Sequence, residues 1–271
     1  MMRSLWTAAS GMVSQQMNVD TISNNLANVN TVGYKKSRME FKSLLYETMA
    51  KAGVDGNGAG RPVNLQIGHG VRAISTAKTY TMGNIEMTDN PLDLAIDGEG
   101  FFAVLGANDE YLYTRDGAFK ISMLDGEAML VTSDGYPILS TDEEPIYIPP
   151  EVNISSLIIG EDGNFSYVDG EGTTIDLGIQ LLVVQFPNRA GLENIGHNFV
   201  KQTSASGEAM YEIDDEVNTR SKLIQGSLES SNVQVVEEMV KLIIAQRAYE
   251  TNSKAIQTSD DMLAQANQLK R

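Results

Sequence analysis

One stretch decides the fold: VVEEMVKLIIAQRAYETNSKAIQTSDDML, residues 235–263. Apolar residues recur in it at a spacing of seven, at Val235, Leu242, Tyr249, Ile256 and Leu263. A seven-residue repeat sustained over this length predicts a long helix with an apolar stripe that a second helix must cover.

The stripe changes character along this helix. Met239 adds to its apolar early part, whereas a neighbouring line becomes polar further on, at Gln246, Ser253 and Asp260. We therefore expect Val235–Tyr249 to make the dry contact with the partner helix, and the later turns to face a wetter surface.

The partner helix is expected at the other end of the chain. Leu5, Met12, Val19 and Leu26 are also spaced by seven, and Ile22 lies on a neighbouring line. Pairing the two terminal helices as a coiled coil would cover both stripes and still leave apolar flanks exposed. We interpret these flanks as contacts for neighbouring copies of the chain.

The middle of the chain has a different pattern. From Ile67 to Ile224, short strand-like runs alternate with Asp-Gly dipeptides, which favour two-residue hairpin turns. These dipeptides begin at Asp97, Asp116, Asp125, Asp134, Asp162 and Asp169. Turn signals at this density predict an all-β body rather than a sheet of alternating strands and helices.

A connecting segment lies between the first helix and this body. The spacing of Phe41, Leu44, Leu45 and Met49 is that of one short helix. The Gly-rich run AGVDGNGAG, residues 52–60, cannot bury a core and is expected to form an extended, exposed loop.

The fold class expected from these patterns is α+β. The chain would have four parts: an N-terminal helix in residues 1–30, a connecting segment in 31–70, a β-rich outer domain in 71–225 and a C-terminal helix in 226–271.

Charge and composition limit the classes of partner. The net charge is −16, and residues 81–222 alone carry 26 acidic and 6 basic side chains. Because phosphate would be repelled by that acidic middle, nucleic acid is not an expected partner. The N-terminus lacks the features of a cleaved signal peptide, and no apolar run is long enough to insert into a membrane.

The sequence carries no convincing catalytic motif. Gly98-x-Gly100-x-x-Ala103 looks like a dinucleotide fingerprint, but the strand-like Phe101–Leu105 follows it where a helix would be required. There is no cysteine, and His69 and His197 are far apart without a metal-site spacing. We expect no enzyme activity, cofactor or metal, although paired carboxylates of a secreted β-rich hydrolase stay a remote alternative.

Motifs at both ends of the chain carry a family resemblance. The run SNNLANVNTVGYK, residues 23–35, resembles the N-terminal signature of the flagellar rod and hook protein family. The runs GSLESSNV (226–233) and QRAYETNSK (246–254) resemble its C-terminal signature. Asp97–Phe102 and Tyr113–Gly117 are similar to landmarks of its β domain, so the resemblance spans the whole chain.

Within this family, the runs FKSLLYET (41–48) and LQIGHGVR (65–72) are most similar to those of distal rod subunits. A sibling axial protein of the proximal rod or hook is the alternative. The resemblance implies a structural subunit that assembles with itself into a rigid helical tube, transmits torque from motor to hook and encloses the export channel. It also implies export by the flagellar type III apparatus without a cleaved signal, and a place in the basal body within the cell envelope or periplasm. Implied neighbours are proximal rod and hook proteins, and ring bushing proteins where an outer membrane is present.

The predicted assembly interface combines the two stripes with signature residues. It comprises Leu5, Trp6, Met12, Val19, Ile22, Asn24, Asn25, Leu26, Asn28, Gly33, Val235, Met239, Leu242, Arg247, Tyr249, Ile256 and Leu263.

Overall fold

The computed structural model describes residues 2–54, 60–61, 63–107, 109–124, 127–149, 152–169, 173–213 and 219–268. The chain is α+β, as expected, and it divides into two compact units that are described separately. The first unit consists of Met1–Ala27, Ser37–Lys78 and Gln234–Arg271, and the second of Asn28–Lys36 and Thr79–Val233.

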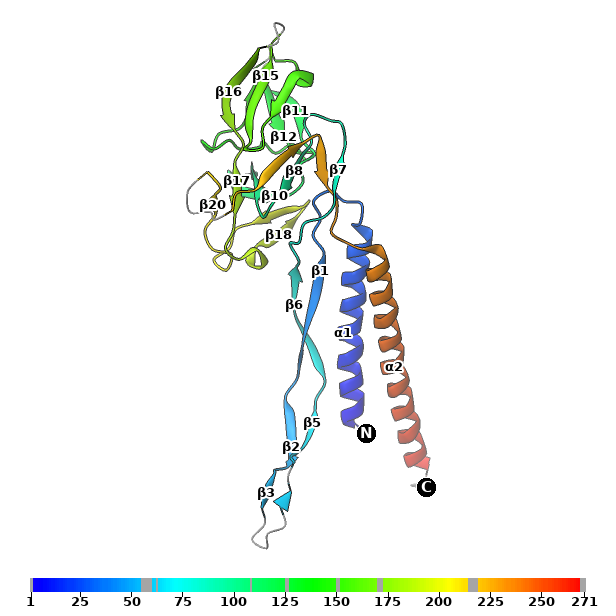
Figure 1. The fold of residues 1–271 in the computed structure, drawn as a ribbon. Coiled ribbons are helices and arrows are strands. Elements are labelled where there is room, and N and C mark those ends of the chain that lie inside the picture. Colours follow the sequence, from blue (N-terminus) through cyan, green and yellow to red (C-terminus); the bar gives the residue numbers. More distant parts are fainter. Residues whose placement is uncertain are drawn as a thin grey trace. The chain divides into compact units, whose positions relative to one another are not determined.

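The first unit contains both helices, α1 (Met2–Ala27) and α2 (Val235–Gln268). They lie side by side and run antiparallel, which confirms the predicted pairing (Figure 1). At one end, the hydroxyls of Ser4 and Ser259 are 3.2 Å apart. At the other end, Asn25 Nδ2 donates a hydrogen bond of 3.1 Å to Glu238 Oε2.

A third contact lies between these two. A Cβ added at Gly11 would meet Asn252 Nδ2 at 2.8 Å, so the glycine lets the helices approach closely there. From Ser4 to Gly11 to Asn25, each step along α1 is matched by an equal step back along α2. The helices therefore share a line of small and polar side chains at heptad spacing.

The predicted dry contact from Val235 to Tyr249 is wrong in part. Those two side chains keep 40% and 41% of their surface exposed, whereas Glu238 and Ala245 are buried. Leu242, further along the predicted stripe, is only half-buried. Two rows of residues, each repeating every seven positions, run along α2. The row with the smaller side chains permits the closer approach of the two helix backbones.

The first unit also contains a long two-stranded ribbon. Strand β1 pairs with β6, β2 with β5 and β3 with β4, all antiparallel. The bounds are β1 (Ser37–Ser43), β2 (Tyr46–Ala50), β3 (Gly53–Val54), β4 (Gly60–Arg61), β5 (Leu65–Gly68) and β6 (Val71–Lys78). Residues 55–59 of the predicted Gly-rich loop are outside the described part of the chain.

The predicted short helix across Phe41–Met49 is wrong, because these residues belong to β1, β2 and the link between them. In β1 the apolar Met39 and Phe41 alternate with charged residues, which is a strand period. The ladder with β6 supplies the backbone hydrogen bonds that a helix would otherwise provide. The ribbon contacts α1, where Val71 N lies 3.4 Å from Ser10 Oγ (Figure 1).

The second unit is the expected all-β body. Its largest sheet has the strand order β18-β19-β10-β9-β17-β20, and smaller sheets are β11-β12-β13, β14-β15-β16, β21-β8 and β22-β7. The bounds are β7 (Ile85–Met87), β8 (Leu94–Asp97), β9 (Phe101–Leu105), β10 (Tyr111–Thr114), β11 (Lys120–Leu124), β12 (Glu127–Val131), β13 (Tyr147–Ile148), β14 (Leu157–Ile159), β15 (Asn164–Val168), β16 (Thr174–Gln180), β17 (Val183–Gln185), β18 (Glu193–Gly196), β19 (Phe199–Lys201), β20 (Met210–Tyr211), β21 (Lys222–Gln225) and β22 (Ser227–Glu229), with short 3-10 helices at Ile154–Ser156 and Arg189–Gly191.

Strand β9 is buried on both faces and divides the core of this body. Phe101 and Ala103 belong to one apolar cluster, and Phe102 and Val104 to another. This alternation is the two-residue period of a strand, here with apolar residues on both sides. The strand predicted after the Gly-x-Gly run is thus confirmed.

Only some of the Asp-Gly dipeptides form hairpin turns. Asp162-Gly163 joins the paired strands β14 and β15, as predicted. Asp97-Gly98 and Asp116-Gly117 instead connect strands that do not pair with each other, so the hairpin prediction is wrong there. A Cβ at Gly117 would lie 1.7 Å from the Leu94 carbonyl oxygen, so this glycine serves close backbone packing.

The helix register predicts a specific disulfide. A Ser4→Cys/Ser259→Cys variant should cross-link within one chain under mild oxidation, because the native hydroxyls are 3.2 Å apart. The natural chain has no cysteine, so the reaction is free of competing thiols. The control Ser4→Cys/Gln257→Cys should stay reduced, and equal cross-linking of both pairs would contradict the register.

Candidate assembly interface

The outward side of α2 is apolar in its first three turns. We call this surface the apolar patch of α2; it consists of Val235, Val236, Met239, Val240, Ile243 and Ile244, all exposed. Beyond Ala245 the exposed residues of the helix are mostly polar, for example Gln246, Arg247 and Asp260. An ordinary protein surface carries single, scattered apolar side chains. Six exposed apolar side chains within ten residues therefore indicate a contact surface.

Two further apolar surfaces lie on the same unit. On α1, Trp6 is 74% exposed, and Val13 and Met17 are exposed at spacings that place all three on one side of the helix. On the ribbon, Leu45 is 88% exposed, and four neighbouring apolar residues are also exposed: Tyr46, Met49, Leu65 and Ile67. An isolated two-stranded ribbon is marginally stable in water, so such a surface is suited to a partner.

The predicted interface residues fall into three groups. Trp6, Asn24, Val235, Met239, Arg247 and Tyr249 are exposed. Leu5, Met12, Val19, Leu26, Asn28, Leu242, Ile256 and Leu263 are half-buried. Ile22, Asn25 and Gly33 are buried within the subunit, where they shape it rather than present a surface.

Asn25 illustrates this shaping role. Its Nδ2 donates to the Ser37 carbonyl at 2.8 Å, and its Oδ1 accepts from the Ser37 amide at 2.9 Å. Its further bond to Glu238 joins the end of α1 to both the start of the ribbon and the start of α2.

The second unit contains a buried ionic cluster that the sequence did not reveal. Glu229 is 1% exposed, and its carboxylate binds two cations. Lys35 Nζ donates to Glu229 Oε1 at 2.5 Å, and Arg115 Nη1 donates to Glu229 Oε2 at 2.9 Å. Each of the three residues lies in one of the signature runs but was absent from the predicted interface. The signal that could have identified Lys35 and Glu229 is a single charge in an otherwise uncharged run, whereas Arg115 lies next to Asp116 and its run carries no such signal.

The cluster also binds the backbone around it. Arg115 donates from Nε to the Gly100 carbonyl at 3.0 Å and from Nη2 to the Gly98 carbonyl. Its guanidinium carbon lies 5.5 Å from the ring centre of Phe101, within cation–π range. The Gly-x-Gly run therefore presents carbonyls to an arginine and has no need of a cofactor to explain it.

The electrostatics of the cluster follow from burial and from two cations sharing one carboxylate. Burial alone would raise the pKa of Glu229, but the charges of Arg115 and Lys35 outweigh it and hold that pKa below its ordinary value. Burial, together with the charge of Arg115, lowers the pKa of Lys35 to about 8 against the attraction of Glu229.

Gly33 lies against this cluster and explains part of the N-terminal signature. Its φ is +67°, and an added Cβ would lie 2.7 Å from the Arg115 carbonyl carbon. Its amide donates to the Glu229 carbonyl at 2.8 Å. Only glycine combines this left-handed conformation with such a close approach.

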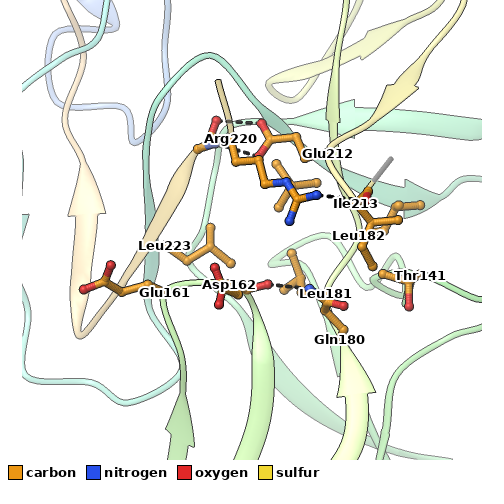
Figure 2. A pocket seen from close by; sticks show the side chains of 12 residues that line it. Thr141, Glu161, Asp162, Gln180, Leu181, Leu182, Glu212, Ile213, Arg220 and Leu223 are labelled. Carbon is orange, nitrogen blue, oxygen red and sulfur yellow. Dashed lines mark hydrogen bonds between the residues drawn. The ribbon is translucent and has the colours of Figure 1, made fainter. Parts of the chain in front are cut away.

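A small cavity of the β body bears on the hydrolase alternative. Figure 2 shows Glu161, Asp162 and Glu212 around it. Its volume is about 40 Å³, room for a few water molecules. Both Glu212 oxygens already accept hydrogen bonds, from Ser221 Oγ at 2.6 Å and the Ser221 amide at 2.7 Å. Glu161 binds Lys222 at 2.7 Å. The two glutamates are therefore occupied by structural contacts, and the space between them does not fit a sugar ring.

No helix in the described part of the chain combines the length and apolar character needed to cross a membrane.

Comparison with known proteins gives family matches to three parts of the chain. The family model described as flagella basal body rod protein matches residues 5–35, and flagellar basal body rod FlgEFG protein C-terminal matches residues 224–269. The model of the flagellar hook protein FlgE/F/G D1 domain matches residues 95–167. The fold and these matches define the class as a flagellar rod or hook protein with paired terminal helices and a β domain.

Relatives narrow this class. The chain is 48% identical to the flagellar basal-body rod protein FlgG of Borreliella burgdorferi over 273 residues, covering 100% of both chains. It is 42% identical to FlgG of Caulobacter vibrioides and 40% identical to FlgG of Bacillus subtilis, covering at least 99% of each chain. The chain belongs to the FlgG family of flagellar basal-body rod proteins. It is a structural subunit of the distal rod in the flagellar basal body and not an enzyme.

The ionic cluster predicts that removing one charge has a large effect on the stability of the fold. Glu229→Gln should lower the free energy of unfolding by about 3–5 kcal/mol, because it leaves two buried cations without a counter-charge. Urea unfolding followed by intrinsic fluorescence measures this. The control Glu161→Gln removes an exposed partner of Lys222 and should leave the midpoint unchanged. Equal effects of the two variants would contradict the role of the cluster.

The lowered pKa of the Glu229 carboxylate predicts that the stability of the fold depends on pH in the acid range. Because the folded-state pKa of Glu229 lies below its ordinary value of 4.5, its ionised form stabilises the fold above that value. This contribution is lost as the pH falls through the folded-state pKa. The stability difference between wild type and Glu229→Gln should therefore shrink in thermal unfolding as the pH falls below 4.5. A difference that stays constant over this range would refute the assignment.

Proposed function

We propose that this distal rod subunit polymerises with itself into a rigid helical tube that transmits torque from motor to hook and encloses the export channel. The observation that carries the proposal is the apolar patch of α2, whose six side chains are exposed. Exposed apolar surfaces on α1 and on the ribbon support it.

The energetics support a polymer rather than a closed dimer. Each large apolar side chain of the patch gains roughly 1.5–3 kcal/mol when it becomes fully buried. The patch, the Trp6 side of α1 and the ribbon are different surfaces, so one copy can bind neighbours through unlike faces. Unlike faces give head-to-tail contacts that extend into helical filaments. Many such contacts acting together would make a stiff shaft.

The polar side chains in the later half of α2 indicate that this part of the helix pair faces water. Gln246 and Asp260 are exposed there, and we infer that this side of the helix pair lines the export channel. The proposed interface contains the seventeen residues predicted from the sequence, of which Asn25, Ile22 and Gly33 would act through the shape of the subunit.

Further partners are proposed from family membership. They are proximal rod and hook proteins at the two ends of the tube, the flagellar type III export apparatus that would deliver the chain without a cleaved signal, and ring bushing proteins where an outer membrane is present. The place of the assembled tube would then be the cell envelope or periplasm.

One substitution tests the proposal. Ile244→Asp puts a charge into the exposed patch and should abolish polymerisation while leaving monomer stability unchanged, because 63% of the surface of Ile244 is exposed within the subunit. Gln257→Asp, an exposed position on the polar half of the same helix, is the matched control and should polymerise like wild type. Sedimentation and negative-stain electron microscopy measure both. Normal tubes from Ile244→Asp would refute the proposed interface.

A further inference from the structure

The chain passes between its two units at four places. These are the peptide links after Ala27, Lys36, Lys78 and Val233. Four separate single chains, each with two soft dihedral angles per residue, would make a loose connection unless they are fixed to one another.

One side chain joins three of these four places within the second unit. Asn232 Oδ1 accepts a hydrogen bond from the Lys36 amide at 2.8 Å. Asn232 Nδ2 donates to the Thr79 carbonyl at 2.8 Å and to the Thr81 carbonyl at 3.1 Å. Lys36, Thr79 and Val233, the neighbour of Asn232, are each the last or first residue of the second unit at a crossing.

Backbone contacts reinforce the same point. The Thr79 amide donates to the Lys36 carbonyl at 2.9 Å, and the Asn232 amide lies 3.4 Å from the Tyr34 carbonyl. The side-chain amide therefore completes a group of bonds in which donors and acceptors of three segments are matched.

The ionic cluster adds further bonds among the same three chain stretches. Lys35 donates both to Glu229 and to the Thr81 carbonyl, the latter at 2.9 Å. The Gly83 amide donates to Glu229 Oε1 at 2.7 Å. Gly33, on the segment that follows Ala27, donates to the Glu229 carbonyl at 2.8 Å. The stretches 28–36 and 79–83, which carry three of the four crossings, are thus bound to the stretch from Glu229 to Asn232, which leads to the fourth.

We propose that Asn232 and the Glu229 cluster form a latch that gathers the three chain stretches carrying the four crossings and sets the stiffness of the joint between the two units. The proposal rests on the proposed function, because the stiffness of each subunit limits the stiffness of the tube. Asn232 is the part of the latch that can be removed on its own, since the ionic cluster stays intact without it. The acidic and basic groups of the cluster keep the second unit folded. The side-chain amide of Asn232 fixes the positions at which the chain leaves that unit.

The test uses the full-length chain. Asn232→Ala removes the acceptor for the Lys36 amide and the donor to two carbonyls. The matched control is Asn188→Ala, which removes a similar side-chain bond, to the Ala205 carbonyl at 2.9 Å, away from the crossings. Polymers of each are imaged by negative-stain electron microscopy to measure their bending persistence length. Hydrogen exchange measures the opening of the Lys36 amide.

We expect Asn232→Ala to polymerise with at least a twofold shorter persistence length and at least tenfold faster exchange of the Lys36 amide, and Asn188→Ala to match wild type. Polymers of Asn232→Ala as straight as wild type would overturn the latch whatever the exchange rate. Failure of Asn232→Ala alone to polymerise would also overturn it, because Asn232 would then serve assembly itself.

The proposed function fails separately if wild type forms no polymer under any condition. Hydrogen exchange on the monomer then decides the latch: an unchanged rate at Lys36 overturns it, and faster exchange in Asn232→Ala supports the gathering of the segments.

Discussion

A buried carboxylate holds the β body of this rod subunit in its particular shape. Glu229 has lost nearly all contact with water, and a buried anion is tolerated only when cations and hydrogen-bond donors replace its hydration. Arg115 and Lys35 meet that requirement, and to do so they must come from segments more than a hundred residues away. The turn at Gly33 and the carbonyls of Gly98 and Gly100 are then arranged around the two cations. Signature runs that are widely separated in the sequence are therefore parts of one electrostatic arrangement.

The helical unit follows a different rule. Its two helices meet through serine, asparagine and glutamate side chains and at a glycine, and part of its apolar surface is turned outward. Polar contacts at defined positions specify the register of a helix pair better than an apolar seam, which can slip. The apolar side chains left outside are then available for other copies. A subunit built in this way suits a polymer, in which the stabilising contacts lie between copies.

The sequence predicted the features that depend on local pattern. The two long helices follow from seven-residue spacing, and the strand at Phe101–Leu105 follows from an apolar run after glycine. What could not be predicted depends on pairing between distant segments. The spacing of Phe41, Leu44 and Leu45 fits a helix, but strand β6 outweighs that preference through its backbone ladder. Two lines of equal period compete on α2, and only the shape of α1 decides that Ala245 is buried while Tyr249 is exposed. The ionic cluster was missed because no local rule says which lysine, arginine and glutamate of a chain will meet.

We propose that neighbouring copies cover the outward apolar patch of α2 in the assembled tube. A helical reconstruction of the polymerised protein by cryo-electron microscopy, at a resolution that shows side chains, tests it most directly. The account predicts that Val236, Val240, Ile243 and Ile244 are buried against other subunits. A tube in which these four side chains face solvent or the channel would contradict it.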